Sequence, residues 1–143
     1  MLSGRSETPV LIVVDASAAI EWLLKSPAGI RIDERLFAPD EILYAPELLY
    51  VEVAQGLKRQ VLSRRLLAIR AEQAIADLLD LQVNHFPHAL VMHRVWELRD
   101  SLSVYDAVYV AMAETLEAPL LTCDAGIASA HGHRAKIELF VAR

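Results

Sequence analysis

The chain has 143 residues, of which 55% are hydrophobic and 23% charged, and its formal net charge is −5. This composition excludes a disordered chain, and no apolar run approaches the roughly 20 residues of a membrane span. A single cysteine, Cys123, excludes an internal disulfide and agrees with a reducing cytoplasm. The acidic balance counts against a nucleic-acid binder, because phosphate contacts favour Lys and Arg.

The first half of the chain begins with a polar stretch, residues 1–9, which predicts a loose tail before a single domain over 10–143. The aliphatic run at 10–14 is typical of a central strand. It is too short for the core of a signal peptide, so export is not indicated and we expect a cytoplasmic protein. Further elements expected up to residue 81 are helices at 16–24, about 30–37 and 46–60, a strand at 42–45, and a helix at 64–81 with Ser63 as its N-cap.

The second half continues the alternation of strands and helices. Strands are expected at 83–86, 120–123 and 137–141, and helices at 87–100, 104–117 and 125–130. Alternation of this kind predicts an α/β fold with a mostly parallel sheet covered by helices on both faces. Ligands of such sheets bind beyond the carboxyl ends of the strands, where Asp15 and Asp124 lie.

Asp106 is the one charge at the start of an otherwise apolar helix, next to Leu102, Tyr109 and Val110 on the helical surface. Burying an unpaired carboxylate costs several kcal/mol, so this position suggests a functional role. The alternative is a first-turn acid three residues after a capping Ser103, stabilised by the helix dipole.

Glu52 shows the same pattern, because it shares a helical face with Leu48 and Leu49 and lies beside Gly56. A surface position at the edge of the apolar stripe is the alternative. Asp15 and Asp124, taken singly, read as ordinary helix N-caps.

Together, these four acids are expected to meet at one edge of the sheet: Asp15, Glu52, Asp106 and Asp124. Carboxylates that close repel unless protons or a cation intervene. A carboxylate-only set without a matching His or Cys set fits Mg²⁺ or Mn²⁺ better than zinc. The chemistry that follows is metal-dependent phosphodiester hydrolysis.

Four stretches of the chain resemble PIN-domain nucleases, in particular the VapC-like toxins of bacterial toxin–antitoxin pairs. They are residues 13–18, 45–53, 103–107 and 120–124, and the resemblance extends from about Val10 to Ala142. The four acids match the family's acidic positions, and Ser17 and Thr122 match polar residues that support its metal site. The departures are a longer tail before Val10 and an unremarkable Cys123.

The resemblance implies a PIN-like three-layer sandwich with four to five strands and an endoribonuclease that needs Mg²⁺ or Mn²⁺. It implies RNA as substrate, often transfer or ribosomal RNA. It also implies a homodimer and a small VapB-like antitoxin that blocks the site, with no role for a membrane.

Five basic residues without an intervening acid lie between positions 58 and 70. Four of them form a candidate RNA-binding arm: Lys58, Arg59, Arg64 and Arg65. The alternative is a solvated helix junction with extended basic side chains. Arg94 and Arg99 are further candidates.

Two other functions compete with the nuclease. A receiver-like signalling domain also gathers acids around magnesium, but it needs a lysine after a late strand, where this chain has Thr122, Cys123 and Asp124. A PIN-like domain that only binds its partner is the other alternative, and the complete set of four acids argues against it.

Overall fold

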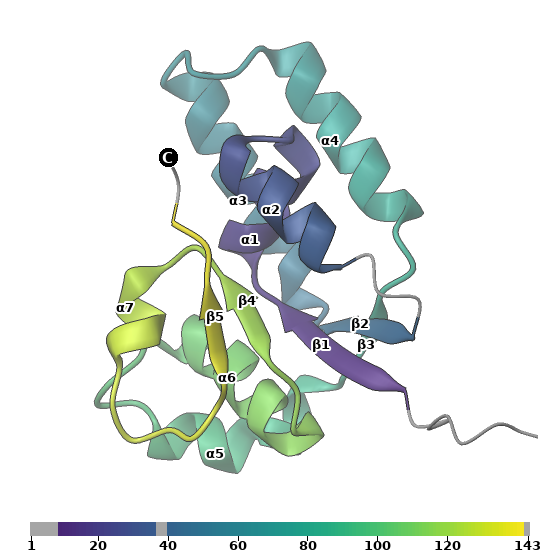
Figure 1. Cartoon of the computed structure of the whole chain (residues 1–143). Helices are drawn as coiled ribbons and strands as arrows, with labels where there is room; N and C mark the ends of the chain where they lie inside the picture. Colours follow the sequence, from purple (N-terminus) through teal and green to yellow (C-terminus); the bar gives the residue numbers. More distant parts are fainter. Residues whose placement is uncertain (1–8, 37–39, 142–143) are drawn as a thin grey trace, which may run out of the picture.

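A parallel sheet forms the centre of the computed structural model, which describes residues 9–36 and 40–141. Its strand order is β3-β2-β1-β4-β5, and every neighbouring pair is parallel (Figure 1). The strands are β1 (Val10–Val14), β2 (Glu41–Ala45), β3 (Asn84–His85), β4 (Leu120–Thr122) and β5 (Ile137–Leu139). The expected parallel sheet is confirmed, whereas residues 1–8 of the expected tail lie outside the described residues.

Helices cover both faces of this sheet. In Figure 1, α1 to α4 form the upper part of the molecule, and α5 to α7 lie with β4 and β5 in the lower part. The helices are α1 (Ala16–Leu24), α2 (Pro27–Arg35), α3 (Leu48–Leu62), α4 (Ala68–Asp80), the 3₁₀ helix η1 (His88–Val91), α5 (Met92–Glu97), α6 (Val104–Leu116) and α7 (Ala125–Ser129). Successive strand residues point to opposite faces, so the full burial of Ile12, Val13 and Val14 shows a three-layer arrangement.

Two glycines let α1 pack closely against its neighbours. A Cβ atom at Gly29 would lie 1.9 Å from the carbonyl oxygen of Glu21, and one at Gly56 would lie 2.4 Å from Cδ1 of Ile20. The second contact brings α3, with Glu52, against α1, which begins directly after Asp15. Gly56 therefore helps to set the width of the region between these two acids.

The predicted N-cap at Ser63 is wrong. Ser63 is the C-cap of α3, and Arg64 then takes a left-handed conformation with φ +62°. The N–H of Arg65 bonds to the carbonyl of Gln60, which ends α3, and α4 begins only after Leu67. The left-handed residue turns the chain away before a new helix can start.

The largest other differences from the prediction are at two helix boundaries. The helix expected at 30–37 begins earlier, because Ser26 caps it through the N–H of Gly29 and Pro27 occupies the first turn. Its expected last residue, 37, lies outside the described residues. The helix expected at 87–100 opens as η1 and ends at Glu97, because the N–H of Leu98 bonds to the carbonyls of both Arg94 and Val95. Such tightening of the last turn is a common way for a helix to stop.

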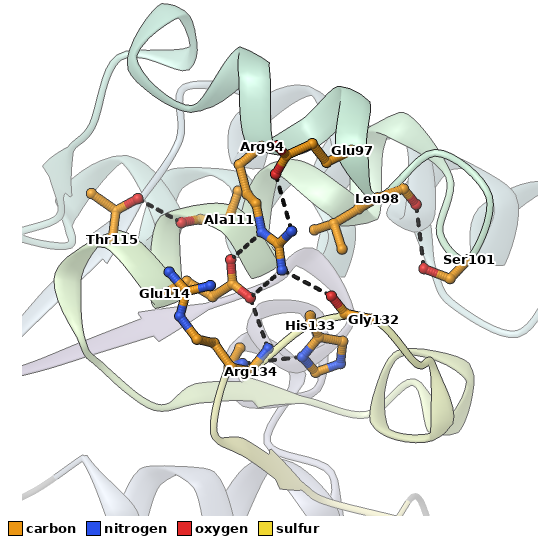
Figure 2. A network of polar contacts seen from close by, with 11 residues as sticks. Arg94, Glu97, Leu98, Ser101, Ala111, Glu114, Thr115, Gly132, His133 and Arg134 are labelled. Atoms are coloured by element: carbon orange, nitrogen blue, oxygen red, sulfur yellow. Dashed lines mark hydrogen bonds and ion pairs between the residues drawn. The ribbon is translucent and has the colours of Figure 1, made fainter.

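Glu114, near the end of α6, is the centre of a polar network (Figure 2). Its two carboxylate oxygens accept hydrogen bonds from Nε and Nη2 of Arg94 at 2.7 and 3.1 Å. The N–H of Arg134 donates to the same carboxylate at 2.8 Å, and Arg94 also donates to the carbonyl of Gly132 at 2.9 Å. This network fastens α5 and the segment before β5 to α6.

Across residues 9–36 and 40–141, every helix falls short of the length and apolar character that a bilayer span demands.

Candidate active site at the carboxyl edge of the sheet

Two neighbouring strands deliver the first two acids. Strands β1 and β4 pair with Val14 beside Leu121, and the N–H of Asp15 donates to the carbonyl of Leu121 at 3.2 Å. Asp15 follows β1, and Asp124 follows β4 after a single intervening residue. The parallel pairing therefore brings both acids to the same edge of the sheet, as the sequence predicted.

Asp15 is buried, and its carboxylate is held by three donors. Oδ1 accepts the N–H of Ala18 at 2.9 Å and the hydroxyl of Ser17 at 2.7 Å, and Thr122 donates to Oδ2. Burial raises the pKa of Asp15 to about 6, although these hydrogen bonds oppose the rise. Asp15 is thus the N-cap of α1 and also a carboxylate fixed in direction, with Ser17 and Thr122 both in contact with it.

Asp124 is exposed and caps the short helix α7. Its Oδ1 accepts the N–H of Gly126 at 2.7 Å, and its own N–H donates to Thr122 at 3.0 Å. Thr122 therefore contacts both strand-end acids, which couples their positions.

Asp106 and Glu52 come from helices. Asp106 lies half-buried in the first turn of α6, where its N–H donates to the hydroxyl of Ser103 at 3.1 Å. The Ser103 cap suggested by the sequence is therefore present. Burial raises the pKa of Asp106, and the negative charges of Asp124 and Glu52 raise it further. An acid whose nearest charges are other acids is not explained by capping alone.

The four acids line one open cleft of about 510 Å³: Asp15, Glu52, Asp106 and Asp124. Within the described part of the chain, none of them forms an ion pair with an Arg, Lys or His side chain. In residues 9–36 and 40–141, no three His, Cys, Asp or Glu side chains form a group that could hold a metal ion. An open set of hard oxygen donors fits an ion that keeps several waters, as Mg²⁺ does, better than a fully protein-caged ion.

Sequence reasoning missed several residues that line the cleft, and two of them, Tyr109 and Glu21, bear on its hydrogen bonds and charge. Tyr109, one turn beyond Asp106 on α6, donates from its hydroxyl to Oε1 of Glu52 at 2.7 Å. The sequence could have indicated this contact, because Tyr109 lies on a helix expected to be buried and a buried tyrosine hydroxyl normally has a hydrogen-bond partner. Glu21 of α1 also lines the cleft, and its sequence context offers no signal, because an acid on a surface helix is ordinary.

The candidate RNA-binding arm divides in two. Arg59 and Arg65 line the cleft with the acids, whereas Lys58 lines an apolar groove between α3 and α4 and Arg64 lies outside the cleft. No lysine lines the cleft in the described part of the chain, so the feature that a receiver-like domain needs is missing there.

The other basic candidates serve the fold. Arg70 donates to the carbonyl of Leu23 at the end of α1 at 2.7 Å. Arg94 is bound to Glu114, and the guanidinium of Arg99 lies over the ring of Trp96. None of these three side chains lines the cleft.

Comparison with known proteins gives one consistent family. The family model described as the PIN domain matches residues 12–132. The curated Ribonuclease VapC12 of Mycobacterium tuberculosis is 38% identical over 129 residues, which cover 90% of this chain and 98% of that protein.

Solved structures give the same fold at low identity. VapBC2 from Rickettsia felis, bound to a DNA fragment from its promoter, has a TM-score of 0.66 at 13% identity and covers 92% of this chain and 99% of that one. Mycobacterium tuberculosis VapC20, described as a toxin that cleaves the Sarcin-Ricin loop, has a TM-score of 0.61 at 19% identity, with 82% and 93% coverage.

Proposed function

Because this chain belongs to the PIN domain family and is similar to its VapC ribonucleases, we propose that it is a metal-dependent endoribonuclease, the toxin of a toxin–antitoxin pair. One observation carries the proposal. The four acids singled out in the sequence line a single open cleft, and none of them is paired with a cation in the described residues. A set of acids that the fold leaves without counter-charge suits a cation that arrives from solution.

Asp15, Glu52 and Asp106 are the proposed ligands of the principal Mg²⁺ or Mn²⁺ ion, directly or through water, and Asp124 completes the site or helps to hold a second ion. When bound, the ion supplies a Lewis acid that neutralises phosphate charge and lets water act as a nucleophile near neutral pH. Water adds to phosphorus in line with the leaving ribose oxygen, whose bond to phosphorus breaks.

The residues around Asp15 give this site its order. Ser17 and Thr122 hold the two oxygens of Asp15, and the N–H of Ala18 adds a third bond. A carboxylate fixed in this way loses less conformational entropy when it binds an ion than a free one. We therefore assign Ser17 and Thr122 the supporting role that the family resemblance implied.

Arg59 and Arg65 are the proposed contacts to the RNA backbone inside the cleft. Glu52, Gly56 and Arg59 lie at intervals of four and three residues on α3, so they share one face of the helix. Seven residues span about 10 Å of helix, which places Arg59 near a phosphate beside the one that is cut. Lys58 and Arg64 lie outside the cleft and are assigned at most a peripheral role.

The proposed partners follow from the relatives. The Rickettsia felis neighbour is a VapBC complex, and we propose a VapB-like antitoxin for this chain too. VapC20 is described as cleaving the Sarcin-Ricin loop, and a structured ribosomal or transfer RNA is the substrate class we propose. Action on RNA, together with the lone cysteine, supports a cytoplasmic location. A homodimer is also proposed, from the family resemblance alone.

Cleavage of total cellular RNA by the purified chain tests the function. We expect discrete fragments with Mg²⁺ or Mn²⁺, and none with a chelator or with the Asp106→Asn variant. Folded wild-type protein, free of bound inhibitor, that cuts no RNA under any of these conditions would overturn the proposal in favour of a binding-only domain.

A further inference from the structure

Tyr109 joins the two helices that supply Glu52 and Asp106. Its side chain is only 1% exposed, and its hydroxyl donates to Oε1 of Glu52 at 2.7 Å. Among the hydrogen bonds of residues 9–36 and 40–141, this is the one that links α3 to α6. The relative placement of the two acids therefore depends on this contact more than on any other polar interaction between these helices.

Glu52 needs such a contact more than the other acids do. Asp15 has three donors, and Asp124 accepts the N–H of Gly126. Glu52 has a longer side chain with more rotatable bonds, and Tyr109 is its one donor within the described residues. A half-buried glutamate without a donor would sample several rotamers across the cleft.

We infer that Tyr109 is a positioning residue for the proposed reaction. Its hydroxyl engages Oε1 of Glu52, fixes the direction of the carboxylate and leaves Oε2 without a protein donor in the described residues. The inference rests on the proposed metal-dependent function, which it deepens by adding a residue that acts through Glu52. Partners that orient a metal ligand in this way typically change affinity or activity by about 10- to 100-fold when removed.

The alternative is that Tyr109 only fills space in the core. Its ring lies on a stretch of α6 that is buried from Ala107 to Glu114, so the aromatic ring contributes to packing whatever the hydroxyl does. Tyr109→Phe keeps the ring and removes only the hydroxyl, so it separates the two roles. Tyr105→Phe is the matched control, because Tyr105 lies on the same helix but is exposed.

The experiment is a calorimetric titration of Mn²⁺ into wild type, Y109F and Y105F, with RNA cleavage measured against Mn²⁺ concentration in parallel. We expect Y109F to bind Mn²⁺ about 10-fold or more weakly, and its cleavage to recover in part at high Mn²⁺. Y105F should behave as wild type. In a Glu52→Gln background, the Tyr109→Phe change should add little, since the two residues act as a unit.

Three results would overturn the inference. Equal Mn²⁺ affinity and metal dependence in Y109F and wild type would leave Tyr109 a packing residue. If Tyr109→Phe weakens Mn²⁺ binding as much in the Glu52→Gln background as in wild type, the hydroxyl does not act through Glu52. A Y109F chain that does not fold would make the hydroxyl structural. Failure of wild type itself to bind Mn²⁺ and cleave RNA would instead refute the proposed function.

Discussion

The two ends of helix α6 carry acids in opposite situations. Asp106, in the first turn, has Asp124 and Glu52 as its charged neighbours, and burial together with these charges raises its pKa. Glu114, near the last turn, is less exposed to solvent than Asp106, yet hydrogen bonds from Arg94 and the N–H of Arg134 outweigh the effect of burial and lower its pKa. Burial alone therefore does not identify a functional acid. The sign of the neighbouring charges separates the two acids, because Glu114 faces a cation and Asp106 faces other acids.

This difference assigns each acid a role. Glu114 is already neutralised by a guanidinium, and the pair fastens the segment before β5 to α5 and α6 (Figure 2). Asp106 and the other three candidate acids form no ion pair in the described residues, so their repulsion remains until a cation or a proton arrives. One end of the helix is thus neutralised within the protein, whereas the acids at the other end would be neutralised by the cation of the proposed function.

The largest expected effects come from replacing the two acids of α6, Asp106 and Glu114, by their amides. Asp106→Asn should lower RNA cleavage by about 10³-fold, because a ligand to an ion worth several kcal/mol is lost, while the metal-free protein stays as stable or becomes more so. Glu114→Gln should lower the free energy of unfolding by about 2 kcal/mol, because Arg94 loses its buried carboxylate partner and keeps only Glu97 and the carbonyl of Gly132. Urea unfolding and cleavage rates of both variants check the prediction, and a Glu114→Gln chain that unfolds as wild type does would break the comparison.

Asp15 predicts a dependence of stability on pH. Its pKa of about 6 in the folded protein lies above the ordinary 3.8. Well below pH 3.8 the group is protonated in both the folded and the unfolded state and has no effect on stability. As the pH rises from 3.8 to about 6, the unfolded chain ionises while the folded protein stays protonated, which favours unfolding; above pH 6 both states are ionised and the loss is complete. This group should therefore lower the free energy of unfolding by roughly 2–3 kcal/mol between pH 4 and 7 in chelator.

The matched measurement is the same pH series for Asp15→Asn, which cannot ionise at this position. The variant should lack this part of the pH dependence and cleave no RNA. Identical pH profiles for the two proteins would show that Asp15 is not a buried carboxylate with a raised pKa.

The smallest expected effect separates the two halves of the basic arm. Replacing both Arg59 and Arg65 by Ala should weaken RNA binding about 10-fold. The slope of the logarithm of the binding constant against the logarithm of the salt concentration should fall by about one to two, because up to two phosphate contacts are lost. The matched pair, Lys58→Ala with Arg64→Ala, removes the same charge outside the cleft and should have a smaller effect. Fluorescence anisotropy at several salt concentrations, with the catalytically inactive Asp106→Asn background, provides the comparison. Equal losses for the two pairs would point to a diffuse electrostatic surface.

The sequence was most informative where the chain's local pattern decides the structure. The aliphatic run before Asp15 and the short strand before Asp124 predicted that these acids meet at one edge, because parallel strands align their carboxyl ends. The apolar context of Asp106 and Glu52 likewise predicted that both lie on partly buried helix faces.

What the sequence could not supply depends on how distant segments dock. Arg94 reads as a possible RNA contact until α5 packs beside α6 and brings it to Glu114, 20 residues further on. Tyr109 reads as a core residue until α3 presents Glu52 to it. Ser63 illustrates a local failure, because a serine before a polar stretch can end one helix as easily as start another.

The most direct test of the central claim is a calorimetric titration of Mn²⁺ into wild type, Asp106→Asn and Glu114→Gln, each shown to be folded at the temperature used. We expect Mn²⁺ to bind wild type and Glu114→Gln, and binding to be strongly reduced in Asp106→Asn. Binding that survives in Asp106→Asn, or that is absent from wild type, would contradict the claim that the four unpaired acids form a metal site.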